Sequence, residues 1–340
     1  MSGATSPVAV LGAGSWGTAL AIHLGRQGTS TRLWGRDAAL LKDIGERREN
    51  TRYLPGISVP SGIDLVTDHG QAVAGTGIVI VAVPSQFVES VLDSMKSAIP
   101  PGAVLLCASK GLEPARGDRI SVVLGRLLPG HPLAVLSGPS FAREVALGRP
   151  TALVVAAHDE AVARLLQQAI AAPAFRLYTN RDVVGVEIAG ALKNVIAIAT
   201  GLADGLELGE NARAALITRG LAEIVRLGVA LGAQPTTFLG LAGLGDLVLT
   251  CTGSLSRNRA LGREVARGRA LTEVEQGTRM IAEGVRTVSS ALRLAREARV
   301  VMPICEEVRA VLFEAKPVGE ALAALLAREP RPEDDRRAES

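Results

Sequence analysis

The sequence predicts two domains: an α/β domain built on a parallel sheet, followed by an all-helical domain. The length of 340 residues exceeds what one hydrophobic core usually supports. In the first half, short runs rich in Val and Ile alternate with helical patterns, which is typical of a parallel sheet covered by helices. After about Asp182, long Ala/Leu-rich segments with helical periodicity follow, separated by Gly and Pro. The expected strands are Val8 to Leu11, Thr31 to Trp34, Ile78 to Val83, Val104 to Ala108, Leu133 to Leu136 and Thr151 to Ala156.

We place the domain boundary near Asp182 to Glu187, where the character of the sequence changes. Residues 1–185 then form the α/β domain and residues 186–328 the helical domain, with a ligand expected in the cleft between them. Residues 329–340 contain two prolines and charges of both signs, but no apolar cluster that a core could bury. We expect this tail to be disordered.

Charge and composition argue against several classes of function. The formal net charge is only +3 and no long basic block occurs, so nucleic-acid binding is not expected. The N-terminus lacks a basic region before its first apolar run, and the longest apolar stretch, Val186 to Ala203, carries Glu187 and Lys193. Neither a secretory signal nor a membrane span is therefore predicted. The three cysteines lie far apart without a CxxC pair, which argues against disulfides and a metal site and favours a reducing cytoplasm.

A glycine-rich loop predicts a dinucleotide site. Gly12, Gly14 and Gly17 form GxGxxG where a short apolar strand ends and an Ala/Leu-rich helix begins. In such a loop the first glycine permits a tight turn, the second leaves room for a pyrophosphate, and the third lets helix and strand pack closely. The free N–H groups of the helix N-terminus would then face the phosphates. We therefore expect the first domain to be of the Rossmann type and to bind NADP or NAD.

The end of the second strand bears on the choice between the two cofactors. An acid there would bind the 2′-hydroxyl of NAD, whereas an arginine would bind the 2′-phosphate of NADP. The strand-end residue is Gly35 and Arg36 follows it, so we expect NADP(H) to be accepted. NAD(H) can also be used if Asp37 turns inward.

Lys193 lies in the interior of a helix whose other residues are largely small or apolar. Burial would depress the pKa of its ammonium group from ~10.4 toward neutrality, where it could donate a proton to an alkoxide formed by hydride transfer. The alternative is a lysine that reaches solvent from an amphipathic helix. The small neighbours Ala189, Gly190 and Ala197 favour close approach of a ligand, and so the catalytic interpretation.

A second unusual segment is the helix predicted to begin at Ser256. Ser256 is a good N-cap, but Arg257 and Arg259 in the first turn oppose the helix dipole. A bound anion would resolve this conflict, since a phosphate could accept bonds from Arg257, Asn258 and the free backbone N–H groups. The alternative is a solvated arginine face. Upstream, Asp246 follows a glycine-rich turn, where it could bind a substrate hydroxyl, orient the lysine, or simply cap the next helix.

Taken together, these segments resemble the bacterial-type NAD(P)-dependent glycerol-3-phosphate dehydrogenases, and the likeness runs from the first strand to about residue 315. The individual motifs are short, but their combination and order are highly specific. They are GAGSWGTALA at 12–21, RYLPG at 52–56, VPS at 83–85, SKGLE at 109–113, SGPSFA at 137–142, AGALKN at 189–194, GLGDL at 243–247 and SRNR at 256–259.

The resemblance implies a fold, an activity and a set of site residues. It implies a helical domain like the C-terminal domain of 6-phosphogluconate dehydrogenase, a possible homodimer, and reduction of dihydroxyacetone phosphate to sn-glycerol 3-phosphate for phospholipid synthesis. It makes Lys193 the catalytic acid and base. The implied substrate contacts are Lys110, Gly138, Ser140, Lys193, Asp246, Ser256, Arg257 and Asn258. The cofactor contacts implied beside the glycine loop are Ser15, Trp16, Arg36, Lys110, Ala142, Arg257, Ile281 and Glu283.

Two other functions fit the same residues. The first is a dehydrogenase of the same scaffold that acts on another phosphorylated ketone or on a 3-hydroxyacid. The second is a module that senses NAD(P) without catalysis, because a fold alone never establishes activity. Lys193, together with the arginines in the first turn of the helix after Ser256, favours an enzyme over a sensing module.

Overall fold

The structure is a computed structural model that describes residues 6–277 and 282–329. It divides into two compact units. The α/β unit comprises the chain up to Ser109 together with residues 120–183, and the helical unit comprises residues 110–119 together with the chain from Val184. We call residues 110–119 the strap. A single boundary near residue 185 would leave the strap with the sheet, but its residues pack with the helical unit.

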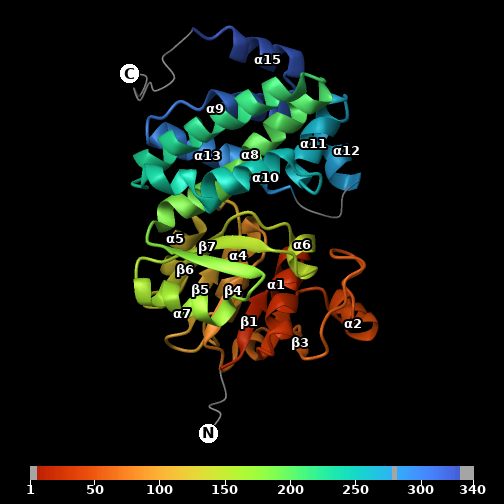
Figure 1. The fold of residues 1–340 in the computed structure, drawn as a ribbon, viewed down its shortest axis with the longest axis vertical. Helices are drawn as coiled ribbons and strands as arrows, with labels where there is room; N and C mark the ends of the chain where they lie inside the picture. The colour runs from red at the N-terminus through yellow and green to blue at the C-terminus, as the bar shows by residue number, and fades with distance from the viewer. Residues whose placement is uncertain (1–5, 278–281, 330–340) are drawn as a thin grey trace. The chain divides into compact units, whose positions relative to one another are not determined.

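The α/β unit is built on one sheet of eight strands, in the order β3-β2-β1-β4-β5-β6-β7-β8 (Figure 1). The sequence pattern predicts six of them. The other two, β3 and β8, are the edge strands, which alternate buried and exposed residues or carry polar ones, and so lack the continuous apolar run of a central strand. The strands are β1 Val8–Leu11, β2 Thr31–Trp34, β3 Ile63–Val66, β4 Ile78–Val81, β5 Val104–Cys107, β6 Leu133–Ser137, β7 Thr151–Ala156 and β8 Phe175–Asn180.

Most neighbouring strands are parallel, as the alternating pattern predicts, with Val10 of β1 aligned with Leu33 of β2 and Ile80 of β4. The exception is the antiparallel pair β6 and β7, so the last two strands run against the other six. The carboxyl ends of β1 to β6 therefore meet at one edge, where ligands of such sheets bind.

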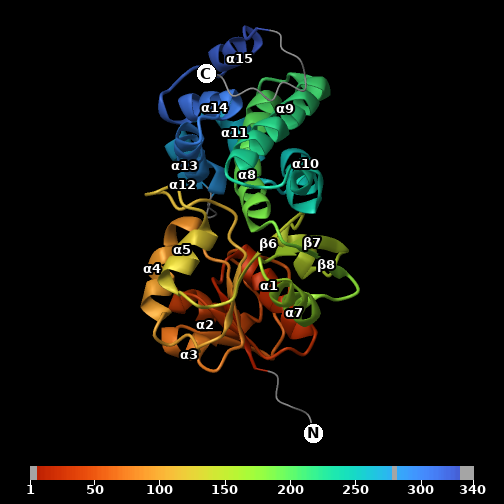
Figure 2. The same ribbon diagram turned by 90° about the vertical axis from the view of Figure 1, so that its left-hand side faces the viewer.

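Helices cover both faces of this sheet, with α4 and α5 on one side and α1 and α7 on the other (Figure 2). Asp37, Asp68 and Asp159 cap three of the helices, each accepting a hydrogen bond from a backbone N–H in the first turn. The helices are α1 Ser15–Arg26, α2 Ala38–Arg47, α3 His69–Val73, η1 Ser85–Phe87, α4 Val88–Met95, α5 Ile120–Leu127, α6 Ala142–Ala146 and α7 Glu160–Ile170.

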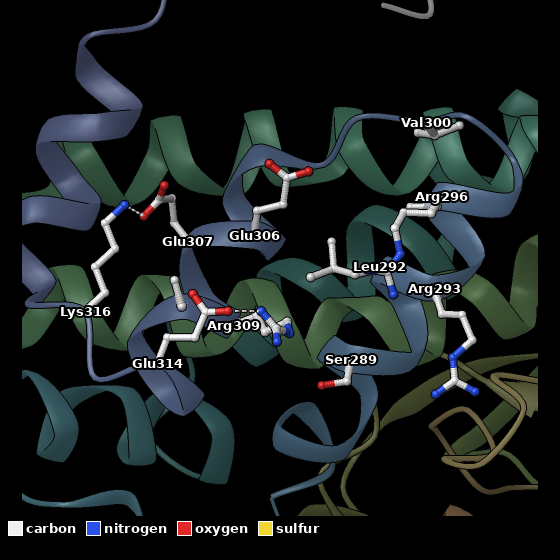
Figure 3. A pocket seen from close by; sticks show the side chains of 12 residues that line it. Ser289, Leu292, Arg293, Arg296, Val300, Glu306, Glu307, Arg309, Glu314 and Lys316 are labelled. Carbon is white, nitrogen blue, oxygen red and sulfur yellow. Dashed lines mark hydrogen bonds and ion pairs between the residues drawn. The ribbon is translucent and has the colours of Figure 1, made fainter.

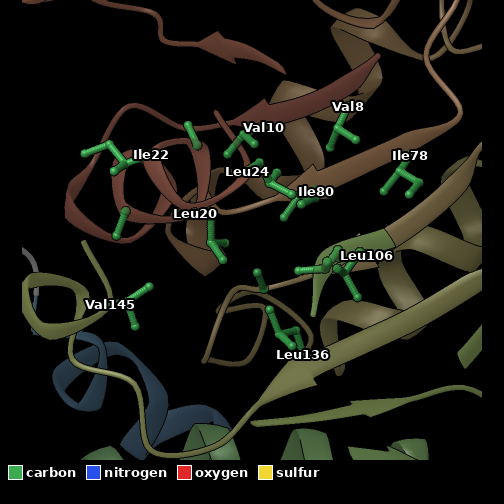
Figure 4. Close-up of a cluster of buried hydrophobic side chains, with 14 of the residues drawn as sticks. Val8, Val10, Leu20, Ile22, Leu24, Ile78, Ile80, Leu106, Leu136 and Val145 are labelled. Carbon is green, nitrogen blue, oxygen red and sulfur yellow. The ribbon is translucent and has the colours of Figure 1, made fainter. Parts of the chain in front are cut away.

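The core of the α/β unit is almost entirely aliphatic, in keeping with an aromatic content of 3%. Figure 4 shows Val10 of β1 and Ile80 of β4 beside Leu20 and Leu24 of α1, all of them fully buried. Burying such side chains contributes roughly 1.5–3 kcal/mol each relative to leaving them exposed. This packing fixes the end of β1 and the start of α1, which carry the glycine loop.

The helical unit is organised around α8, Val183–Gly205, whose side chains are mostly buried. This helix is long and apolar enough to cross a membrane by length and composition, but 94% of its most apolar window is buried inside the protein. The other elements of this unit include a 3-10 helix, η2, and a π-helical turn, η3. They are α9 Gly209–Ala230, η2 Pro235–Leu239, η3 Leu241–Gly245, α10 Asp246–Thr252, α11 Arg257–Ala266, α12 Leu271–Gly277, α13 Glu283–Glu297, α14 Pro303–Phe313 and α15 Val318–Leu326.

Candidate active site

The glycine loop between β1 and α1 has the geometry that its sequence predicts. Gly12 has φ +120°, and a Cβ there would lie 2.8 Å from the Ala82 carbonyl oxygen. A Cβ at Gly17 would lie 1.9 Å from the Gly12 carbonyl oxygen, so only glycine lets α1 approach the turn. Apart from Gly14 itself and its two neighbours in the chain, no residue has an atom within 4 Å of the position that a Cβ of Gly14 would take. The loop is therefore closely packed at its first and third glycines and open at the second.

The N-terminus of α1 suits an anionic ligand. Gly14 is its N-cap and makes no side-chain cap bond, and the first turn contains no acidic residue. Its residues Ser15 and Trp16 are both predicted cofactor contacts, and the Trp16 indole is held by a hydrogen bond from Nε1 to the Ala108 carbonyl, 3.2 Å away. The open space at Gly14 and the uncapped N–H groups together fit the pyrophosphate of a dinucleotide.

The residues after β2 differ in how far their side chains are engaged by other groups of the protein, and the predicted contact of Arg36 with the cofactor stays a prediction. A Cβ at Gly35 would lie 2.9 Å from the Cβ of Ala13, which leaves no room for an acid at the strand end. Asp37 accepts a hydrogen bond from the Leu40 amide at 3.0 Å and pairs with Arg52 at 3.0 Å, so both its carboxylate oxygens are engaged. Arg36 is exposed, with its guanidinium 4.7 Å from the centre of the Phe87 ring.

In the helical unit, two lysines share one buried carboxylate. Lys193 Nζ lies 2.5 Å from Asp246 Oδ1, and Lys110 Nζ lies 2.9 Å from Asp246 Oδ2. The side chain of Asp246 is 1% exposed, that of Lys193 7% and that of Lys110 17%. A burial this deep excludes the alternative in which Lys193 reaches solvent. Lys110 is the most accessible of the three groups.

The surroundings of Lys193 bring the pKa of its ammonium group close to neutrality. Burial lowers the pKa of Lys193 from 10.5 to about 7, and the Lys110 ammonium acts in the same direction, while the Asp246 carboxylate opposes both. An ammonium with such a pKa can give up and regain a proton at physiological pH. This is the property that the predicted role of Lys193 as general acid and base requires, and the role itself stays a prediction.

Asp246 is positioned by an unusual turn. The π-helical turn η3, Leu241–Gly245, leads directly into α10, of which Asp246 is the first residue. A Cβ at Gly243 would lie 2.1 Å from the Phe238 carbonyl oxygen, so this close packing requires glycine. In the structure the Asp246 carboxylate accepts hydrogen bonds from both lysines, while its predicted contact with a substrate hydroxyl stays a prediction. π-Helical turns of this kind are frequent at functional sites.

A chain of amide hydrogen bonds leads to the backbone of Lys110. The backbone N–H of Gly284 donates to Asn258 Oδ1 at 3.0 Å, and Asn258 Nδ2 donates to Asn194 Oδ1 at 2.9 Å. Asn194 Nδ2 then donates to the Lys110 carbonyl at 3.1 Å. The sequence argument gave Asn194 no role, although an amide beside Lys193 within an apolar helix was a signal that could have found it.

The strap holds Lys110 in the helical unit. Leu112 belongs to the core of this unit, and Arg119 pairs with Glu187 at 3.0 Å, the glutamate side chain being 2% exposed. The Ser290 hydroxyl donates to the Glu113 carbonyl at 3.3 Å, and Arg293 donates to the carbonyl of Ala115. Lys110 follows β5 in sequence, yet its partners come from α8 and α10.

The start of α11 lies against the same chain of amides. Ser256 is its N-cap, accepting a hydrogen bond from the Arg259 amide at 3.3 Å, which confirms the predicted cap, and Arg257 is the first helical residue and is exposed. Glu283, at the start of α13, attracts the Arg257 guanidinium. Ile281 lies outside the described residues. The Asn258 side chain binds Asn194 and Gly284, so its predicted substrate contact stays a prediction.

Three predicted contacts follow β6 in the α/β unit. Gly138 has φ +131°, and the Ser140 hydroxyl donates to its carbonyl at 2.8 Å. Ala142 is the first residue of the short helix α6. Their roles toward substrate or cofactor stay predictions. Within residues 6–277 and 282–329, no group of three or more His, Cys, Asp or Glu side chains is placed to hold a metal ion.

The helical unit also has a polar hollow of about 590 Å³, which shares no residue with the lysine pair (Figure 3). Most of its charges are already satisfied, because Arg309 pairs with Glu314 and Lys316 with Glu307. Its lining residues are Ser289, Leu292, Arg293, Ala295, Arg296, Val300, Glu306, Glu307, Arg309, Ala310, Glu314 and Lys316. The cluster around Asp246 differs from this hollow, because it contains a buried lysine whose pKa is about 7.

Comparison with known proteins gives a consistent assignment. Residues 7–163 match the family described as NAD-dependent glycerol-3-phosphate dehydrogenase N-terminus, and residues 182–323 match the C-terminus of the same family. The chain is 51% identical over 324 residues to a glycerol-3-phosphate dehydrogenase (NAD(P)+) of Geobacter sp. (strain M21), covering 94% of this chain and 97% of that protein. It is 48% identical to the protein of that name from Xanthomonas campestris pv. campestris (strain B100), covering 98% of each.

A solved structure agrees with this assignment. The crystal structure of glycerol-3-phosphate dehydrogenase from Coxiella burnetii superimposes with a TM-score of 0.93 at 39% sequence identity, covering 96% of this chain and 100% of that one. The predicted order of a Rossmann-type domain and a helical domain is thereby confirmed. On these matches, and on the glycine loop and the lysine pair, the chain belongs to the family of NAD(P)-dependent glycerol-3-phosphate dehydrogenases.

Proposed function

We propose that this enzyme reduces dihydroxyacetone phosphate to sn-glycerol 3-phosphate with NADPH or NADH. The observation that carries the proposal is the Lys193–Asp246–Lys110 cluster, which contains a buried ammonium group with a pKa near neutrality. Hydrogen bonds through Asn194 and Asn258 connect this cluster to the start of α11, whose first residue is an arginine. The cluster suits reduction of a carbonyl, and the start of α11 suits a phosphate. The names of the relatives support the same substrate.

The chain's own residues supply the proton chemistry. When bound, the reduced nicotinamide provides a hydride for the substrate carbonyl carbon. Lys193 then gives its proton to the alkoxide oxygen, while the more accessible Lys110 ammonium stabilises the negative charge that develops there. Asp246 keeps both ammonium groups oriented, and in the oxidation direction neutral Lys193 accepts the hydroxyl proton.

The start of α11 binds the substrate phosphate. Arg257 is exposed in the first turn, where the free backbone N–H groups also favour an anion. A charge-assisted hydrogen bond contributes ~1.5–3 kcal/mol, which outweighs the ~0.3–1 kcal/mol by which a cation at a helix N-terminus is unfavourable. The phosphate thereby explains why an arginine begins this helix.

The cofactor is held by the glycine loop, and Arg36 binds the 2′-phosphate of NADP(H). Support comes from the crowding at Gly35 and from Asp37, whose two oxygens are occupied by Leu40 and Arg52. Use of NAD(H) remains compatible with this arrangement, because the pyrophosphate contacts at Gly12, Gly14 and Gly17 are common to both cofactors.

The setting of the enzyme is inferred from the same features. The product suits glycerophospholipid synthesis, and three buried free thiols suit a reducing cytoplasm. The buried polar residues Glu187, Lys193 and Asn194 make α8 a core helix of a soluble protein. A homodimer is inferred only from the family resemblance.

Loss of NAD(P)H absorbance on addition of dihydroxyacetone phosphate tests the activity. We expect rapid oxidation by the wild type, and a raised KM with little change of kcat in Arg257→Ala. Arg263→Ala, which removes an exposed arginine of the same helix, is the matched control. Absence of oxidation by a folded protein that binds NAD(P)H would overturn the substrate assignment, and other phosphorylated ketones and 3-hydroxyacids would then be tried before a sensing role.

A further inference from the structure

Helices α8 and α11 touch backbone to backbone through three glycines. A Cβ at Gly201 of α8 would lie 2.1 Å from the Arg259 carbonyl oxygen, and one at Gly262 of α11 would lie 2.2 Å from the Ile198 carbonyl oxygen. A Cβ at Gly205 would lie 2.5 Å from the Cβ of Ala266. Not even a methyl group fits at these points, so the two helices cross at a fixed separation.

An ionic clamp locks this crossing. Asp204 lies on α8 between Gly201 and Gly205, and its side chain is only 8% exposed. Arg259 Nε donates to Asp204 Oδ2 at 2.6 Å, and Arg213 Nε of α9 donates to Asp204 Oδ1 at 2.8 Å. Arg259 Nη1 also donates to the Thr252 carbonyl at the end of α10, 2.8 Å away. One guanidinium thus joins α11 to both α8 and α10.

The helices that this clamp joins carry both the proton donor and the phosphate anchor of the proposed site. Lys193 lies eight residues before Gly201 on the same helix, a distance of about 12 Å along its axis. Arg257 lies two residues before Arg259, and α10 begins with Asp246. The crossing therefore fixes α11, which carries the phosphate anchor, relative to α8 and α10, which carry the proton donor and its partner.

We propose that Arg259 is a positioning residue which, through Asp204 and the Thr252 carbonyl, sets the spacing between Lys193 and the phosphate site at Arg257. This inference rests on the proposed function, because it takes Arg257 as the phosphate anchor. A lysine cannot replace Arg259, since bonds in two fixed directions require the guanidinium fork. The clamp selects substrates whose phosphate and carbonyl are separated by that spacing.

The test compares a substrate that has the phosphate with one that lacks it. Dihydroxyacetone phosphate needs the spacing, whereas glycolaldehyde, a carbonyl compound without phosphate, needs only the lysine cluster. In Arg259→Gln and in Asp204→Asn we expect kcat/KM for dihydroxyacetone phosphate to fall about 10- to 100-fold, because small misplacements of bound groups have effects of this size. We expect kcat/KM for glycolaldehyde to change little.

Controls separate this inference from the proposed function. Arg263→Gln removes an exposed guanidinium from the same helix and should leave both substrates unaffected. Arg257→Ala gives the full phosphate-specific loss for comparison, and a wild type inactive toward dihydroxyacetone phosphate would instead refute the proposed function.

Three results would overturn the positioning role. They are an equal loss with both substrates, unchanged activity with dihydroxyacetone phosphate, and full activity in Arg259→Lys. If Arg259→Gln does not fold, as judged by circular dichroism, the near-isosteric Asp204→Asn decides by itself, since it must show the same selective loss.

Discussion

The Nζ atom of Lys193 lies 2.5 Å from Oδ1 of Asp246, and the other oxygen of the same carboxylate holds Lys110. One buried carboxylate therefore orients two ammonium groups. Lys193 is the more deeply buried of the two lysines, and this burial lowers its pKa to about 7. In the proposed mechanism we therefore assign proton transfer to Lys193 and charge stabilisation to Lys110, and the first predictions follow from this assignment.

The two directions of the reaction should have opposite pH dependence. Reduction needs protonated Lys193, so kcat/KM for dihydroxyacetone phosphate should fall as the pH rises through about 7. Oxidation of glycerol 3-phosphate needs neutral Lys193, so its kcat/KM should rise over the same range. Steady-state kinetics from pH 5.5 to 9, in steps of about half a unit, measure both. Profiles that bend in the same direction would argue against Lys193 as the titrating group.

The buried lysine should also affect stability. Its folded pKa of about 7 lies below its ordinary value of 10.5, so between these values the unfolded chain binds more protons than the folded one. The unfolding free energy of the wild type should therefore increase with pH in this window relative to Lys193→Met, by at most ~1.4 kcal/mol per pH unit. Urea unfolding of both proteins at pH 6, 8 and 10 measures this difference. Parallel stability curves would contradict it.

Removing the charge of Asp246 should impair catalysis and move its pH profile. In Asp246→Asn the two ammonium groups lose their shared counter-charge, so the pKa of Lys193 should fall further. A smaller fraction of Lys193 is then protonated at pH 7. We expect kcat/KM for reduction at pH 7 to fall ~10-fold or more, with the midpoint of its profile displaced to lower pH. Asp64→Asn, at an exposed position of β3, is the control. A reduced rate with an unmoved midpoint would show that Asp246 does not tune Lys193.

Arg36 should distinguish the two cofactors. Arg36→Ala removes the guanidinium assigned to the 2′-phosphate, so KM for NADPH should rise ~10- to 100-fold while KM for NADH changes little. Arg176→Ala, at an exposed position of β8, should change neither value. Titration of each variant with both cofactors tests this assignment. Equal effects of Arg36→Ala on NADPH and NADH would remove Arg36 from the role.

The features that the sequence predicts well are local ones. The glycine loop, the Ser256 cap and the anomalous Lys193 each depend on a few neighbouring residues, and all three have the expected geometry. The central strands are predictable because burial on both faces gives continuous apolar runs. The edge strands β3 and β8 lack such runs, and local patterns did not indicate that β6 and β7 are antiparallel.

The features that local patterns miss depend on distant residues. Lys110 and Asp246 are 136 residues apart, and Asn194 binds a carbonyl 84 residues before it. No periodicity or spacing connects such positions, so the resemblance could name Lys110 but could not say that the strap packs with the helical unit. The clamp between Asp204 and Arg259 could not be predicted for the same reason. The residues next to Arg259 in the sequence suggest only that an arginine in the first turn of a helix contacts an anion.

The central claim is that Lys193 provides the proton, and Lys193→Met tests it most directly beside Lys42→Met, which removes a surface lysine with a side chain 77% exposed. Cofactor binding is followed by quenching of tryptophan fluorescence, and turnover by NADPH absorbance with saturating dihydroxyacetone phosphate. We predict that both variants bind NADPH like the wild type, that Lys42→Met turns over normally, and that kcat of Lys193→Met falls about 10²- to 10⁴-fold, the usual contribution of a general acid. A Lys193→Met enzyme whose kcat stays within a few-fold of the wild-type value would contradict the account.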